Sequence, residues 1–132
     1  MDENKRKHLE FIQGVITRMN SNSFLIKGWT ITLVSALFAL AAKDSNLNFV
    51  LVSYIAIPTF WVLDGFFIAT ERQYRALYKE VAKRDELEID FNMDVSIYKI
   101  NNSWIIGIFS KTLIPFYCIF IVTTLIIMFL IK

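Results

Sequence analysis

Three long apolar runs dominate the chain and predict three helices that cross a membrane. They cover residues 24–42, 47–69 and 112–131. A helix needs about 20 mostly apolar residues to span the hydrocarbon core of a bilayer. Inside these runs only Lys27 and Asp64 carry charge. The pattern therefore predicts an all-α integral membrane protein with three transmembrane helices.

The segment before the first run, residues 1–22, shows helical periodicity of a different kind. Its apolar positions recur at spacings of three and four and so share one face of a helix: Leu9, Ile12, Ile16 and Met19. The sequence "NSNS" at 20–23 predicts a break after this amphipathic helix and a cap for the next. Three surfaces remain open for the apolar face: the bilayer interface, another subunit, or a pore mouth where the helix would act as a gate.

Residues 23–70 predict a transmembrane hairpin. The short polar turn "KDSNLN" separates the first two runs, so their helices should be antiparallel neighbours. The first helix carries a stripe of small residues, typical of close helix–helix contact in membranes: Gly28, Thr32, Ser35, Ala36 and Ala39. One chain with three spans is too small to enclose a pore, so the stripe indicates a homo-oligomer.

The segment 71–110 first continues the second helix and then changes period. No stop signal follows Ala69, and apolar positions persist at helical spacing, which predicts one helix from Leu47 to about Glu86. The following "IDFNMDVSI", residues 89–97, alternates strictly and predicts a strand. Such a strand must pack extended against the helices or pair across subunits. Asn102 or Ser103 should then cap one last helix, whose transmembrane part is 111–132.

Basic residues are distributed asymmetrically although the net charge is only +2. Nearly all Lys and Arg residues lie in 1–27 or 71–111, and the two remaining ones are Lys43 and Lys132. The positive-inside rule therefore places the N-terminus and the segment 71–110 in the cytoplasm, and the C-terminus on the opposite, periplasmic side.

Asp64 is the most unusual residue, because a charge within a transmembrane segment is costly and usually has a partner. Counting back from the turn at equal rise on both helices puts Asp64 opposite Ile26 or Lys27. We therefore predict a Lys27–Asp64 ion pair, within one subunit or between neighbours. It either orients two helices or takes part directly in conduction or gating.

The cytoplasmic cations form a candidate site for an anionic ligand such as a nucleotide. These residues are Lys5, Arg6, Lys7, Arg18, Arg72, Arg75 and Lys79. The positive-inside bias and contact with lipid headgroups account for the same charges without any ligand. Both interpretations stand at this stage.

Catalytic and metal-binding patterns are missing from the sequence. It has no nucleophile elbow, no metal-ligand spacing and no glycine-rich phosphate loop. The single His8 stands in a charged run and reads as a solvated side chain, and the single Cys118 cannot form an internal disulfide. We expect no enzyme activity, no metal and no cofactor.

Several stretches together resemble a widespread group of small bacterial inner-membrane proteins. They are "VITRMNSNSFLIKGWTITLVSALFALAAKDS", "FWVLDGFFIATERQYRALY" and "DFNMDVSIY" with "SWIIGIFSKTLIPFY". The chain is similar to the membrane effector of Hailong-type anti-phage defence, which is paired with a co-encoded nucleotidyltransferase. The resemblance implies an oligomeric channel in the bacterial inner membrane, held shut by short DNA oligomers and opened on infection to depolarise the membrane. It also implies that the N-terminal helix is the gate.

Two functional readings follow. The first is an oligomeric channel effector gated by a cytoplasmic ligand. The second is a non-conducting membrane anchor or assembly subunit that recruits a cytoplasmic partner through residues 71–102. A small transporter is disfavoured because internal repeats and paired broken helices are missing from the sequence.

Overall fold

The computed structural model describes residues 3–44 and 47–131, and this part of the chain contains helices but no strand. The long helices are α1 (Glu3–Asp44), α2 (Leu47–Lys83) and α4 (Leu113–Ile131), and α3 (Trp104–Ile108) is short. Two 3₁₀ turns, Glu86–Glu88 and Ser96–Tyr98, lie between α2 and α3. By length and composition α1, α2 and α4 can each cross a membrane, as predicted.

The predicted break at residues 20–23 is wrong, because α1 runs through it as one helix. Serine and asparagine interrupt a helix when their side chains bond the local backbone. Here Ser23 instead donates a hydrogen bond to Asp64 on α2. The 42 residues of α1 give a rod about 63 Å long, roughly twice the hydrocarbon thickness of a bilayer. The amphipathic segment and the first span are therefore one continuous element.

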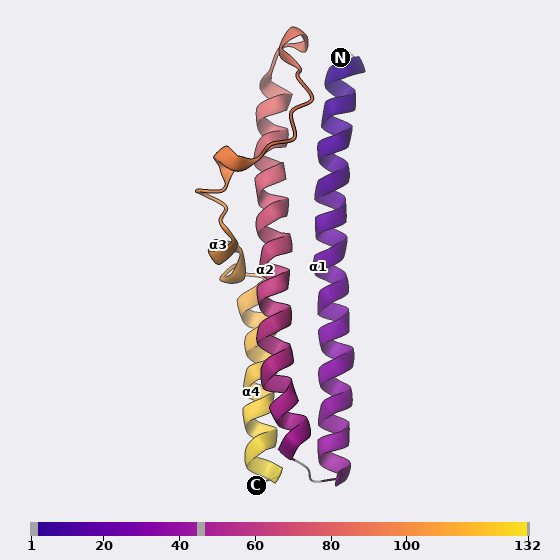
Figure 1. Cartoon of the computed structure of the whole chain (residues 1–132), viewed down its shortest axis with the longest axis vertical. Coiled ribbons are helices and arrows are strands. Elements are labelled where there is room, and N and C mark those ends of the chain that lie inside the picture. Colours follow the sequence, from indigo (N-terminus) through magenta and orange to yellow (C-terminus); the bar gives the residue numbers. More distant parts are fainter. Residues whose placement is uncertain (1–2, 45–46, 132) are drawn as a thin grey trace.

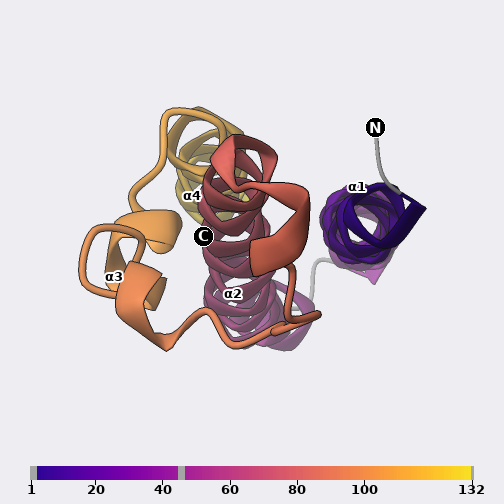
Figure 2. The same ribbon diagram turned by 90° about the horizontal axis from the view of Figure 1, so that it is seen from above.

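The second helix also extends well beyond its apolar part and ends at Lys83, close to the predicted end. Figure 1 shows α1 and α2 side by side and antiparallel. The helix α4 lies only against the N-terminal half of α2. Seen end-on, α2 lies between α1 on one side and α3 with α4 on the other (Figure 2). This arrangement makes α2 the central helix of the protein.

The apolar face of the N-terminal segment packs against α2 of the same chain. Ile12 is fully buried and Ile16 is 3% exposed, in a cluster with Leu77 and Val81 of α2. Leu9 belongs to this cluster, whereas Met19 is only half-buried and lies outside it. This apolar face is thus covered by α2 of the same chain, which was not among the three predicted surfaces. It forms the core of a two-helix rod that extends beyond the apolar spans.

The predicted strand at 89–97 is wrong, for a local reason. Its polar residues each accept a hydrogen bond from the backbone N–H two residues ahead: Asp90 from Asn92, Asn92 from Asp94, and Asp94 from Ser96. These bonds are Asx-turns, which compete with a strand ladder. The backbone N–H of Asn92 lowers the pKa of the Asp90 carboxyl, and the Ser96 hydroxyl together with the Ser96 backbone N–H lowers the pKa of the Asp94 carboxyl, because these donors stabilise the charged forms.

The segment nevertheless packs against the helices, which agrees in part with one predicted alternative, but it is not extended throughout, because Phe91 has a φ of 54° and a 3₁₀ turn begins at Ser96. Its residues Ile89, Met93 and Val95 contact the cluster formed by α1 and α2. His8, predicted to be solvated, is fully buried beneath this segment, and its Nε2 lies 3.0 Å from the carbonyl oxygen of Asn92. Apolar residues of the alternating pattern therefore pack on the rod formed by α1 and α2.

The last helix is divided, in contrast to the single helix predicted. Ser103 caps α3 as expected, but α3 ends at Ile108 and α4 begins at Leu113. Two tryptophans fix α3 to α2: the indole N–H of Trp61 donates to the carbonyl of Ile108 at 2.7 Å, and that of Trp104 donates to the carbonyl of Val62 at 2.8 Å.

Glycines make this close approach of α2 and α3 possible. A Cβ on Gly65 would lie 2.9 Å from the Cα of Ile108, and a Cβ on Gly107 would overlap the carbonyl oxygen of Gly65. Real Cβ atoms do not approach backbone so closely, so the two helices contact through bare backbone. By contrast, a Cβ on Gly14 would meet no atom within 4 Å.

Replacing Gly65 by alanine should therefore separate α3 from α2. We expect Gly65→Ala to lower the free energy of unfolding by about 1–3 kcal/mol, as overpacking does, in denaturant titrations of the detergent-solubilised protein. The matched control Gly14→Ala lies in an exposed helical position and should be neutral or stabilising by up to about 1 kcal/mol. A Gly65→Ala protein as stable as wild type would contradict the backbone contact.

Candidate functional site

Asp64 lies at the point where the three long helices meet. Its side chain is fully buried, although it belongs to the apolar part of α2. The Nζ of Lys27 on α1 lies 2.7 Å from Oδ2, and the hydroxyl of Tyr117 on α4 donates to the same oxygen at 2.9 Å. Ser23 on α1 donates to Oδ1. We call these four residues the Asp64 cluster.

The partners of Asp64 also hold one another in place. Lys27 follows Ser23 by one helical turn, and its Nζ donates to the Ser23 Oγ at 2.8 Å. The Tyr117 ring stacks on the indole of Trp61, with centroids 5.7 Å apart and an interplanar angle of 5°. Because Trp61 also binds Ile108, the cluster is connected to the contact between α2 and α3.

Hydrogen bonding explains how a carboxylate is accommodated here. An unpaired charge in hydrocarbon is costly, and removing one partner of a buried pair typically destabilises a protein by about 3–5 kcal/mol. Asp64 accepts bonds from three side chains, and one of these is a cation. Charge-assisted bonds of this kind are about twice as strong as neutral ones. The cluster therefore couples the packing of α1, α2 and α4 to one charge.

The predicted Lys27–Asp64 pair is present, and it lies within a single chain. Sequence reasoning missed Ser23 and Tyr117. Ser23 was interpreted as part of a helix break, although its position one turn before Lys27 is a signal that it shares the same face. Tyr117 carries the only phenolic hydroxyl of the third apolar run, which is a further signal for a polar partner inside the membrane.

A groove opens beside the Asp64 cluster, at the level where α2 changes from apolar to charged residues. Its volume is about 440 Å³, and its lining comprises Asn20, Ser23, Phe24, Lys27, Ile68, Glu71, Arg72, Arg75 and Thr112. Three of these residues are cations and one is a carboxylate. Glu71 is held by Arg75 at 2.7 Å, whereas the described residues provide no ion pair for Arg72. The groove thus has an excess of positive charge.

The basic residues proposed as an anion site do not form a single site. Arg72 and Arg75 line the groove together with Lys27, which was assigned only to the ion pair. Lys5 lies in a separate pocket with Arg84, about 20 Å along α1 from the level of Arg18. The remaining predicted cations line neither of these two pockets: Arg6, Lys7, Arg18 and Lys79.

Lys27 belongs to both the groove and the Asp64 cluster. Its side chain is 18% exposed, whereas Asp64 is completely enclosed. A lysine ammonium has three donors, of which the cluster uses two, for Asp64 and Ser23. The third donates to no side chain or backbone oxygen among the described residues, and the ammonium lies 5.9 Å from the centroid of the Phe116 ring. Any anion bound in the groove would therefore contact the residue that neutralises Asp64.

No group of three or more His, Cys, Asp or Glu residues within 3–44 and 47–131 is arranged to hold a metal ion. The arrangement at the Asp64 cluster suits electrostatic coupling between helices.

A double-mutant cycle tests the ion pair. We expect Lys27→Met and Asp64→Asn each to lower the free energy of unfolding, Lys27→Met by about 3–5 kcal/mol because it leaves the buried carboxylate without its cation. The double variant should lose less than the sum of the two, measured by denaturant titration in detergent.

The more exposed pair Arg84 and Asp90, whose side chains are 26% and 54% exposed, provides the control, because exposed ion pairs couple by at most about 1 kcal/mol. Strictly additive effects of Lys27→Met and Asp64→Asn would show that the two residues do not interact in the folded protein.

Comparison of the chain with models of protein families, with curated proteins and with solved structures finds no match. No relative therefore supplies a function for the groove or for the Asp64 cluster. The functional argument rests on the contacts described above.

Proposed function

We propose that this protein is an oligomeric channel effector of the bacterial inner membrane, and that an anionic ligand bound in the cytoplasmic groove controls its opening. One observation carries the proposal: Lys27 lines the groove and also forms the ion pair with Asp64. A ligand in the groove would thereby act on the contact between three spanning helices. This is a differential contact of the kind that gating requires.

Contacts available in the groove favour a ligand that holds the helices together. A phosphate that accepts bonds from Lys27 on α1 and from Arg72 and Arg75 on α2 would bridge the two helices without removing Lys27 from Asp64. Losing the ligand would remove this bridge and leave Arg72 without an anionic partner, while Lys27 and Arg75 would keep their ion pairs with Asp64 and Glu71. This agrees with the resemblance noted above, which implies a channel held shut by short DNA oligomers.

An assembly of several chains is part of the proposal. The small residues on α1 are exposed in the single chain, and a face of this kind lets membrane helices approach closely. A ring of chains would bring the cationic grooves to one cytoplasmic rim. Since the face of Leu9, Ile12 and Ile16 is buried on α2, a gate at this end would move as the α1–α2 rod and not as a separate N-terminal helix.

A second reading, the non-conducting anchor, is favoured by one observation. Between α2 and α3 three large apolar side chains are strongly exposed: Leu87, Ile97 and Ile100, with exposed fractions of 100%, 76% and 83%. A cytoplasmic protein such as a co-encoded nucleotidyltransferase would cover such residues. In this reading the membrane part only positions that partner.

Ion flux separates the two readings. We expect liposomes that contain the purified protein to lose an imposed potassium gradient, and short single-stranded DNA oligomers on the groove side to suppress the flux. The double variant Arg72→Gln/Arg75→Gln should conduct but respond at least about tenfold more weakly to the oligomers, because charge-assisted bonds are each worth about 1.5–3 kcal/mol.

Lys79→Gln is the matched control, since it removes a cation from the same helix outside the groove. It should respond to DNA oligomers as wild type does. Equal weakening by Lys79→Gln would indicate diffuse attraction and contradict the groove as the site. No flux in any condition would support the anchor.

A further inference from the structure

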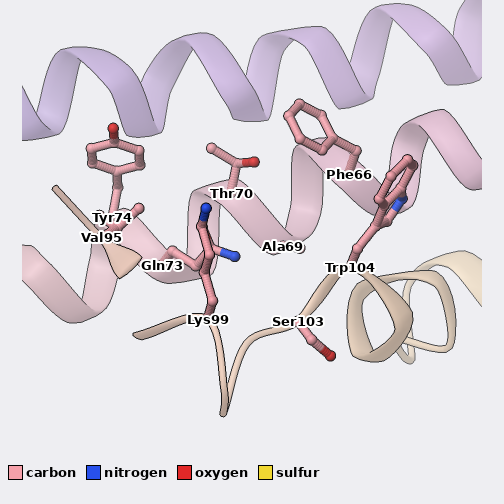
Figure 3. Close-up of a pocket in the computed structure, with 9 residues that line it drawn as sticks. All are labelled: Phe66, Ala69, Thr70, Gln73, Tyr74, Val95, Lys99, Ser103 and Trp104. Atoms are coloured by element: carbon pink, nitrogen blue, oxygen red, sulfur yellow. The ribbon is translucent and has the colours of Figure 1, made fainter. Parts of the chain in front are cut away.

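A second cavity lies on the opposite side of α2 from the cationic groove. Its volume is about 450 Å³, within the range of small-molecule sites. One wall is α2 and the other is the chain that leads into α3 (Figure 3). The lining comprises Phe66, Ala69, Thr70, Gln73, Tyr74, Val95, Lys99, Ser103 and Trp104.

One end of the cavity is apolar and aromatic. Phe66 and Trp104 meet edge to face there, with ring centroids 5.6 Å apart. The Trp104 indole is fixed by its hydrogen bond to Val62, yet the side chain remains 48% exposed. This end therefore offers a rigid, open aromatic surface to an apolar chain.

The other end is polar and contains a cation. Figure 3 shows the Lys99 side chain extending from the loop toward α2, near Thr70 and Gln73. Gln73 is occupied, because its amide donates to the carbonyl of Asn102 at 2.8 Å. Within the described residues Lys99 forms no ion pair, although its charge lies close enough to Asp94 to help lower the pKa of that carboxyl. The Lys99 ammonium and the Thr70 hydroxyl are thus the donors that a ligand would meet.

The two ends lie on either side of the position where the second apolar run of the sequence ends. The apolar run of α2 ends at Ala69, and its charged residues begin at Glu71. In a bilayer that ends where this run ends, Phe66 would lie at acyl-chain depth, and Thr70 and Gln73 would lie at headgroup depth. Tryptophan is enriched at this same level, where its amphipathic ring suits the interface.

We infer that this cavity binds one anionic phospholipid from the membrane. Its phosphate binds Lys99 and Thr70, and the upper part of an acyl chain lies on Phe66 and Trp104. The order of polar and apolar groups along the cavity matches the order of groups along a phospholipid. A free phosphate compound would use only the polar end and would leave the aromatic end exposed.

The bound lipid would cover the region that connects the membrane part to the cytoplasmic rod. Lys99 belongs to the same loop as Val95, which is buried against the α1–α2 cluster. The lipid would therefore brace this loop against α2. This site is separate from the cationic groove and does not depend on the proposed channel function.

Native mass spectrometry of the purified protein with phosphatidylglycerol and phosphatidylcholine tests the site. We expect one phosphatidylglycerol to remain bound under conditions that remove phosphatidylcholine. Lys99→Gln should weaken phosphatidylglycerol binding about tenfold or more, by loss of a charge-assisted contact. Phe66→Ala should weaken it as well, because it removes the acyl-chain surface while leaving Lys99 in place.

Lys111→Gln is the control. Lys111 is an exposed cation just before the start of α4, and it does not line the cavity. Its lipid binding should equal that of wild type. An equal loss in Lys111→Gln and Lys99→Gln would overturn the site in favour of general attraction to basic residues. Displacement of the lipid by an equal concentration of soluble glycerol phosphate would also overturn it, since the acyl chain would then contribute nothing.

Discussion

The buried carboxylate of Asp64 is the constraint around which the membrane part is arranged. A charge at this position needs donors on every side, and α1 and α4 supply them through Ser23, Lys27 and Tyr117. Apolar helices in a lipid environment gain little from the hydrophobic effect between them, so directional bonds and close packing decide their neighbours. Lys27, which pairs with this charge, also lines the cationic groove.

Much of the architecture was predictable from patterns that are physically direct. Run length identified the three spanning helices, and the short turn after α1 set the register that brought Lys27 opposite Asp64. The helical periodicity beyond Ala69 predicted that α2 continues, and it ends at Lys83. These predictions depend only on helix geometry and on the free-energy cost of an unpaired charge in hydrocarbon. Neither depends on how the other side chains pack.

The wrong predictions have a common cause. Each rests on a local sequence pattern at a position where tertiary contacts determine the conformation. Residues 20–23 resemble a cap, but Ser23 forms its bond to another helix. Residues 89–97 alternate as a strand does, but Asx-turns use the same polar residues. The last helix is divided where α3 contacts α2 through Gly65 and Gly107, and no local sequence pattern reveals this contact. Tyr117 likewise became recognisable only when α4 was placed against Asp64.

The pairing of Asp64 with Lys27 is tested most directly by measuring the contact between the Lys27 Nζ and the Asp64 carboxylate in lipid. Solid-state NMR on protein labelled with ¹⁵N at lysine side chains and ¹³C at aspartate carboxyls reports this distance through the dipolar coupling, with Lys27→Met as the assignment control. We expect a strong coupling in the reconstituted protein, in keeping with a distance of 2.7 Å from Nζ to Oδ2. A spectrum in which Lys27→Met removes no coupling would contradict it, because Asp64 would then have another partner.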